Sequence, residues 1–170
     1  MNADLLERSY RVLFYDERED YDRVIEELTE HLKENPSSNI AFNNRAVAYR
    51  EIGEIEKALH DLDMAILNTK VDYIPFVNRG QLSEKLDEIG KALENYSRAI
   101  AIARDDATVY RCRAFAYVKM GAWRQAIDDF SRAIFLEPNF KGTRLDRGRA
   151  YEAIGDQENA QRDYLRAKES

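Results

Sequence analysis

The hydrophobic and polar positions of this chain follow one pattern that returns every 34 residues. Within each period, small and large apolar residues stand three, four and seven residues apart, which places them on one face of a helix. We count places within a period from residues 5, 39, 73, 107 and 141. A fixed period of this length is typical of stacked repeat proteins. The clearest marker is the seventh place, which holds Arg11, Arg45, Arg79, Arg113 and Arg147.

Each period also contains a break near its middle. Gly53, Gly121 and Gly155 stand at the fifteenth place, where glycine readily adopts the left-handed conformation that ends a helix. Pro36 and Pro138 close the first and fourth periods, where a helix must stop. The pattern therefore predicts a helix, a tight turn and a second helix in every period. First helices are predicted near residues 3–15, 39–51, 73–86, 107–119 and 141–153, and second helices near 20–34, 54–68, 88–102, 122–135 and 156–168.

The pattern resembles the tetratricopeptide repeat family over nearly all of the chain. The family's signature places are best matched in the fourth period, by Tyr110, Ala114, Tyr117, Gly121, Ala126, Phe130, Ala133 and Pro138. The first period departs most, with Val24 and His31 where small residues are expected. The resemblance implies one domain over residues 1–170, with a degenerate unit at 5–38 and further units at 39–72, 73–106, 107–140 and 141–170. The implied fold is all-α, a right-handed α-solenoid of stacked antiparallel helix pairs with about ten helices.

The row of arginines has two interpretations. At the twenty-third place, on the second helix of each unit, stand Asp61, Asn95, Asp129 and Asp163. Pairing of each arginine with one of these side chains, within a repeat or between neighbours, is the structural interpretation that we favour, because the guanidinium fork can form two hydrogen bonds at once. The alternative is a row of anion-binding arginines along a groove.

The last unit differs on the face that a further repeat would cover. Gln157, Gln161 and Lys168 replace the apolar residues that earlier units have at these places. Because an uncapped stack exposes an apolar face, we expect this unit to cap the C-terminal end of a complete protein. The chain is then expected to be a monomer. A dimer through the apolar first helix is the alternative, and its contacts would come from Leu5, Leu6, Leu13 and Phe14.

In the tetratricopeptide repeat family the first helices line a concave surface, so the resemblance implies that their outward residues face a partner. Asn44 and Asn78 are informative there, because an amide both donates and accepts hydrogen bonds and so suits an extended peptide backbone. The family's carboxylate clamp is not expected, because its lysine is missing from the second place. The expected partner-binding residues are Asn43, Asn44, Val47, Arg50, Val77, Asn78, Gln81, Arg111, Phe115, Lys119, Leu145 and Arg149.

Charge and chemistry narrow the function further. The net charge of -6 disfavours a general nucleic-acid binder, while Arg111, Lys119 and Arg149 indicate a partner with an acidic segment. His31 and His60 are the only histidines and have no ligand partner at metal spacing, and no phosphate-binding loop is present. We therefore expect no metal, no cofactor and no enzymatic activity. The chain shows no signal peptide and no run of 18 apolar residues, so a cytoplasmic protein without membrane contact is expected.

Three functions remain after these exclusions. The first is a protein- or peptide-binding scaffold, an adaptor or chaperone, that uses its concave groove. The second is an inhibitor or immunity-type protein dedicated to masking one partner, which the small acidic chain would suit. The third is a structural assembly subunit. Cys112, the only cysteine, is expected to be a small buried hydrophobe rather than a reactive thiol.

Overall fold

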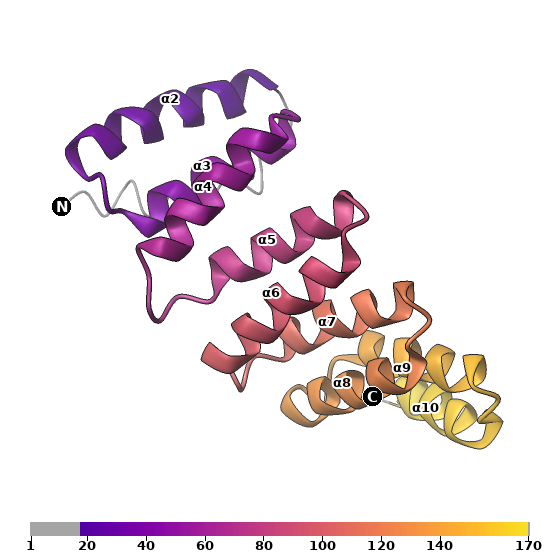
Figure 1. The fold of residues 1–170 in the computed structure, drawn as a ribbon. Coiled ribbons are helices and arrows are strands. Elements are labelled where there is room, and N and C mark those ends of the chain that lie inside the picture. Colours follow the sequence, from indigo (N-terminus) through magenta and orange to yellow (C-terminus); the bar gives the residue numbers. More distant parts are fainter. Residues whose placement is uncertain (1–17, 170) are drawn as a thin grey trace. The chain divides into compact units, whose positions relative to one another are not determined.

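The computed structural model describes residues 18–169, and these residues form helices joined by short turns, with no strand among them (Figure 1). The helix predicted near residues 3–15, with Arg11 and the apolar residues of the alternative dimer, lies outside the described part of the chain. Every other predicted helix is confirmed to within two residues at either end. The helices are α2 (Arg18–Glu34), α3 (Asn39–Glu51), α4 (Ile55–Leu67), α5 (Ile74–Lys85), α6 (Ile89–Ile102), α7 (Ala107–Lys119), α8 (Trp123–Leu136), α9 (Lys141–Ala153) and α10 (Gln157–Glu169).

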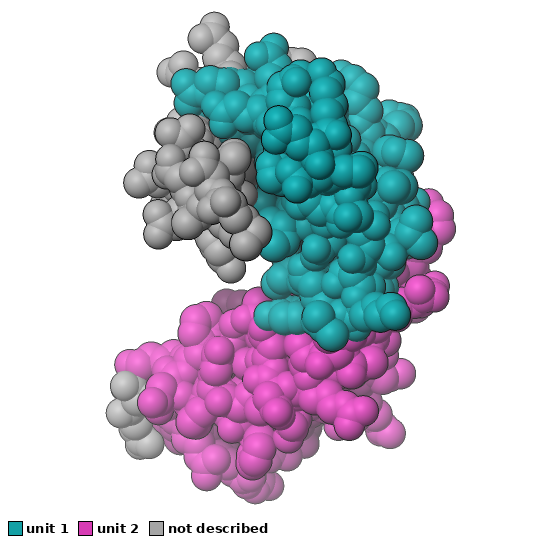
Figure 2. Space-filling view, turned by 90° about the vertical axis from the view of Figure 1, so that its left-hand side faces the viewer, with its two compact units in different colours: residues 1–82 teal, residues 83–170 magenta. Residues whose placement is uncertain are grey.

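The chain divides into two compact units, residues 1–82 and residues 83–170, with the boundary inside α5 (Figure 2). In the first unit α3 packs against both α2 and α4. In the second unit α7 packs against α6 and α8, and α9 packs against α8 and α10. Within each unit, a first helix therefore contacts the second helix of the repeat before it. The expectation that residues 1–170 act as one domain stays a prediction.

Small residues at the predicted places are buried between the helices. Large residues fill the remaining space, with Tyr96 and Phe130 fully buried and Leu62 only 2% exposed. The small side chains let the helix axes approach, and the large ones interdigitate between them. Alanines at the eighth, twentieth and twenty-seventh places that are at most 1% exposed are Ala46, Ala58, Ala65, Ala92, Ala99, Ala114, Ala126, Ala133 and Ala160.

The turn inside each hairpin depends on one left-handed residue at the fifteenth place. Gly53, Gly121 and Gly155 have φ values of 84°, 70° and 80° there. In the third repeat the same place holds Asp87, whose φ is 59°. Aspartate is one of the few residues other than glycine that enters this region at modest cost, so the third hairpin keeps the same turn.

Gly148 allows a close approach between the two helices of the last hairpin. A Cβ atom built on Gly148 of α9 would lie 2.5 Å from Cε1 of Tyr164 on α10, far inside van der Waals contact. The Tyr164 hydroxyl is held in turn by a hydrogen bond of 2.8 Å to Glu152. The ring therefore has little freedom to move away from a larger residue.

We expect Gly148→Ala to lower the free energy of unfolding by about 1–3 kcal/mol, because the added methyl group forces Tyr164 out of its position. Gly90→Ala is the matched control, since a Cβ on Gly90 of α6 would meet nothing within 4 Å. That control should raise the free energy of unfolding by about 0.5–1 kcal/mol through helix propensity alone. Urea denaturation of both variants measures the difference, and equal effects would contradict the packing argument.

Candidate functional site

The repeated arginines are structural in the second, fourth and fifth repeats. Arg45 Nε and Nη2 donate to the two carboxylate oxygens of Asp61 at 2.7 and 2.8 Å. Arg113 binds Asp129, and Arg147 binds Asp163, through the same two-bond geometry. The Asp61 side chain is only 2% exposed. These hydrogen bonds raise the pKa of each arginine above its ordinary value, and the interpretation of the row as structural ion pairs is confirmed.

Each of these arginines also reaches the preceding repeat through its third nitrogen, Nη1. Arg45 Nη1 donates to Thr29 Oγ1 at 2.9 Å, and Arg147 Nη1 donates to Ser131 Oγ at 2.9 Å. The acceptor always stands at the twenty-fifth place. Its hydroxyl hydrogen is already used, because Thr29 and Ser131 each donate to the carbonyl four residues earlier on their own helix at 2.6 Å. The hydroxyl oxygen is therefore oriented to accept from the arginine.

The third repeat arranges its ion pair differently from the sequence-based expectation. Arg79 Nη2 lies 2.9 Å from a carboxylate oxygen of Asp63, which stands at the twenty-fifth place of the preceding repeat. Asn95, the expected partner of Arg79, instead donates its amide hydrogen to the Lys91 carbonyl at 2.8 Å. The neutral Asn95 at the twenty-third place is thus accompanied by a carboxylate at the twenty-fifth place of the preceding repeat. The first, third and fourth repeats carry a hydroxyl at that place.

Aromatic rings flank the half-buried arginines. The guanidinium carbons of Arg45, Arg113 and Arg147 lie 5.7–5.9 Å from tyrosine ring centres at the eleventh place, one helical turn later. Cation–π attraction and exclusion of water both strengthen the ion pairs there. In the third repeat the eleventh place is Ser83, and the Arg79 side chain is correspondingly more exposed, at 34%.

We expect Asp163→Asn to lower the free energy of unfolding by about 2 kcal/mol, because the half-buried Arg147 loses its carboxylate. Adding Ser131→Asp should recover at least half of this loss, since the pair then copies the Asn95 and Asp63 arrangement of the third repeat. Ser131→Asp alone should not stabilise the chain, because Asp163 already neutralises the arginine. A double-mutant cycle by chemical denaturation gives the coupling, and strictly additive effects would contradict the exchange.

On the first helices of the first unit, three predicted asparagines form a chain of amides. Asn78 Nδ2 donates to Asn43 Oδ1 at 2.8 Å, and Asn43 Nδ2 donates to Asn44 Oδ1 at 3.3 Å. Asn43 is only 7% exposed, so it offers little surface itself. Asn44 Nδ2 is buried and donates to no described group. The structure thus brings the three amides together and leaves one donor unused at the end of the chain.

The other predicted residues of this unit are largely engaged. Val77 is 8% exposed and belongs to the core. Val47 packs against the apolar cluster that α2, α3 and α4 share. Arg50 is paired with Glu51 at 2.8 Å and donates to Gln81 at 3.4 Å. The fifth place of the repeat, which is expected to face a partner, is therefore buried at both Asn43 and Val77.

Two predicted apolar residues stay exposed in the second unit. Phe115 of α7 is 42% exposed and Leu145 of α9 is 38% exposed. The Phe115 ring packs edge-on against the fully buried Phe130, with ring centres 5.3 Å apart. Phe115 is consequently an exposed aromatic side chain that is held in a fixed orientation.

The three basic residues expected to attract an acidic partner each have a carboxylate partner of their own. Lys119 Nζ lies 2.5 Å from Glu84, and Arg149 lies 3.1 Å from Asp146. Arg111 is paired with a glutamate on the turn after α8. Burial raises the pKa of Asp146, an effect that Arg149 opposes. These three cations are thus locally neutralised.

A pair of tyrosine–glutamate hydrogen bonds on this face was not anticipated from the sequence. The hydroxyl of Tyr96 donates to Glu84 at 2.5 Å, and that of Tyr164 donates to Glu152 at 2.8 Å. Burial, with the hydrogen bond to Glu84 adding to it, raises the pKa of Tyr96. Both pairs join the twenty-fourth place to the twelfth. Comparing these two places across the repeats could have found the pairs. The twelfth place is glutamate only where the twenty-fourth is tyrosine, and not where it is leucine or phenylalanine.

Other candidate chemistry is limited in the described residues. Cys112 is half-buried, whereas a small buried hydrophobe is the favoured interpretation of its sequence position. Within residues 18–169 no group of three histidine, cysteine or carboxylate side chains could hold a metal ion. No helix in that same part of the chain is long and apolar enough to cross a membrane.

Known proteins share the repeat pattern and the fold of this chain. A family model described as a TPR repeat matches residues 85–121. No curated protein matches the chain. Among solved structures, MamA is 25% identical, with 88% of each chain covered and a TM-score of 0.81. MamA from Desulfovibrio magneticus RS-1 is 18% identical, covering 97% of this chain and 92% of its own, with a TM-score of 0.80.

A further solved structure resembles this chain in fold. YrrB, described as a TPR protein with an unusual peptide-binding site, is 17% identical, with coverage of 88% and 77% and a TM-score of 0.72. These similarities support a protein-interaction scaffold in general. The resemblance inferred from the 34-residue period is thereby confirmed: residues 85–121 match a TPR repeat model, and the described residues have the helical solenoid fold of TPR proteins.

Proposed function

We propose that this chain is a non-catalytic adaptor or chaperone that binds a protein or peptide segment through the outward face of its first helices. The observation that carries the proposal is Phe115, an exposed aromatic ring locked against a buried one. Rigid aromatic side chains dominate the energy of many interfaces, because they bury a large area and lose little conformational entropy on binding.

The amide chain of the first unit supports the same function. An extended peptide presents alternating carbonyl and N–H groups, and asparagine side chains satisfy both kinds. Asn78, Asn43 and Asn44 already form a directional row of donors and acceptors, with one donor of Asn44 left over. A rotation of the Asn44 side chain would present this donor to a peptide carbonyl. The unusual peptide-binding site described for YrrB is consistent with such a use of the fold.

The partner can be identified by site-specific photo-crosslinking in the cell that makes this protein. A benzophenone amino acid replaces Phe115 in one variant and the exposed Gln161 of α10 in the control. We expect a protein crosslinked from position 115 and not from position 161, identified by mass spectrometry. Equal crosslinking from both positions would contradict binding at the first-helix face.

With the partner purified, Phe115→Ala should weaken its binding at least tenfold, about 1.4 kcal/mol or more. Asn44→Ala should weaken it by a smaller factor, because one hydrogen bond is lost. Thermal unfolding of the Phe115 variant should change little, since the ring is nearly half exposed. Isothermal titration calorimetry measures the affinities, and wild-type affinity of both variants would reject the proposed face.

A further inference from the structure

The end of the α7–α8 hairpin carries two phenylalanines that the repeat architecture does not require. Phe135, on the last turn of α8, is 73% exposed, and Phe140, directly before α9, is 50% exposed. Their repeat places, the twenty-ninth and the thirty-fourth, otherwise accept very different residues. The twenty-ninth place has Lys33, Leu67 and Ala101, and the thirty-fourth place has Ser38, Asp72 and Asp106.

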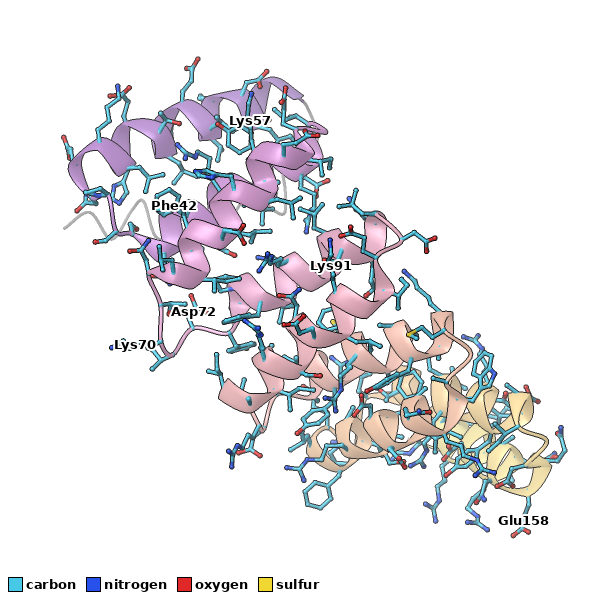
Figure 3. All side chains as sticks on the ribbon, in the orientation of Figure 1. Phe42, Lys57, Lys70, Asp72, Lys91 and Glu158 are labelled. Atoms are coloured by element: carbon cyan, nitrogen blue, oxygen red, sulfur yellow. The ribbon has the colours of Figure 1, made fainter. Side chains whose placement is uncertain are left out.

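Phe140 stands where the other first helices have a capping side chain. Ser38 Oγ accepts from the Ala41 N–H at 3.3 Å at the start of α3, and Asp106 caps α7 at 2.8 Å. Asp72, labelled in Figure 3, accepts from the first N–H of α5 at 2.9 Å. A phenyl ring cannot accept these bonds, and α9 has no side-chain cap. The fourth repeat has therefore exchanged a helix cap for an exposed aromatic ring.

Arginines cover both rings and hold them at the surface. The guanidinium of Arg132 lies 5.2 Å from the ring centre of Phe135 and 5.9 Å from that of Tyr110. The guanidinium of Arg111 lies 4.5 Å from the ring centre of Phe140. These are cation–π distances, so each exposed ring lies against a guanidinium group rather than standing alone.

The two segments that carry these rings and arginines have an excess of positive charge. Residues 104–111 and 132–144 contain five basic and three acidic side chains, in a chain whose net charge is -6. Asp105 forms an ion pair with Arg132 at 3.3 Å, and Glu137 forms one with Arg111 at 2.6 Å. The third acidic residue, Asp106, caps α7. Within the described chain, no carboxylate lies in ion-pair range of the three remaining cations, which are Arg104, Lys141 and Arg144.

We propose that this aromatic–arginine surface, formed by Arg104, Tyr110, Arg111, Arg132, Phe135 and Phe140, docks an acidic linear peptide segment that carries large apolar side chains. Carboxylates of the segment meet the surplus cations, which are Arg104 in this surface and Lys141 and Arg144 on the first turn of α9. Its apolar side chains cover the exposed faces of the two rings. Asp105 is 85% exposed beside the rings, which disfavours the continuous phosphate backbone of a nucleic acid. Spaced peptide carboxylates avoid that repulsion. The proposal does not depend on Phe115 or Asn44, the residues on which the proposed function rests.

The test uses the full chain and a fluorescein-labelled peptide in which two phenylalanines are separated by glutamates and aspartates. Fluorescence anisotropy should show saturable binding that weakens as salt is raised, because the attraction between charges is screened. Phe135→Ala together with Phe140→Ser should weaken binding at least tenfold. These changes copy Ala101 and Ser38 at the same repeat places, and the second change restores a side-chain cap to α9, so the fold is retained.

Leu67→Ala is the matched control, because Leu67 is 77% exposed at the place equivalent to Phe135. It should change the affinity less than twofold. Phe135→Ala alone tests the surface independently of α9, with an expected loss of at least threefold. Peptides with serine for the acidic residues, or alanine for the phenylalanines, should each bind at least tenfold more weakly than the parent peptide.

Three results would overturn the proposal. The first is no binding of the acidic peptide to the wild-type chain, and the second is unchanged binding by the Phe135 and Phe140 variants. The third is tighter, phenylalanine-dependent binding of single-stranded DNA or of phosphatidylserine vesicles, which would assign the surface to a different class of partner.

Discussion

The arginine at the seventh place connects three helices with one side chain, and the packing of the repeats depends on this connection. In the second, fourth and fifth repeats it lies on the first helix, binds a nearly buried aspartate on the second helix, and donates to a hydroxyl on the second helix of the preceding repeat. A buried carboxylate without its partner is costly, so the three helices have one favourable register. The alanines between them then allow the axes to approach as closely as this register requires.

The third repeat shows that residues at two interacting places of the repeat change together. Its neutral Asn95 accompanies the carboxylate of Asp63 in the preceding repeat, so that Arg79 keeps an anionic partner. The tyrosines at the twenty-fourth place are likewise found with glutamates at the twelfth. In each set the group that changes is a hydrogen-bonded partner, and the compensation is electrostatic rather than steric.

The sequence predicts the helices closely because the 34-residue period repeats the same physical requirements several times over. Small residues, turn residues and the arginine all indicate the same repeat boundaries. A repeat that departs at one place can therefore still be aligned by the others. Exposure on the first helices is less predictable. Val77 is buried and Phe115 is exposed although the repeat pattern assigns both to the same face, because burial depends on which neighbouring side chain covers each position.

The contacts of the candidate site could be predicted from the sequence only where a residue type usually forms one kind of interaction. The bidentate pairs follow from the geometry of arginine and aspartate, whereas the partner of Arg79 depends on a hydroxyl place whose significance appears only with the Nη1 contacts. The exposed ring of Phe140 stands out only when the caps of the other first helices are known. Departures of this kind, where one repeat gives up a local preference, are expected at functional surfaces.

The arginine of the third repeat takes its carboxylate, Asp63, from the preceding repeat, and this limits how far the repeats are interchangeable. A protein assembled by reordering these modules would keep every hairpin intact and could still lose stability at a single junction. A third-type repeat placed after one that has serine at the twenty-fifth place would bring an arginine and no acid to that junction. A module for such exchange should therefore begin and end between the two helices of a hairpin. Asp63 and Arg79 then always belong to the same module.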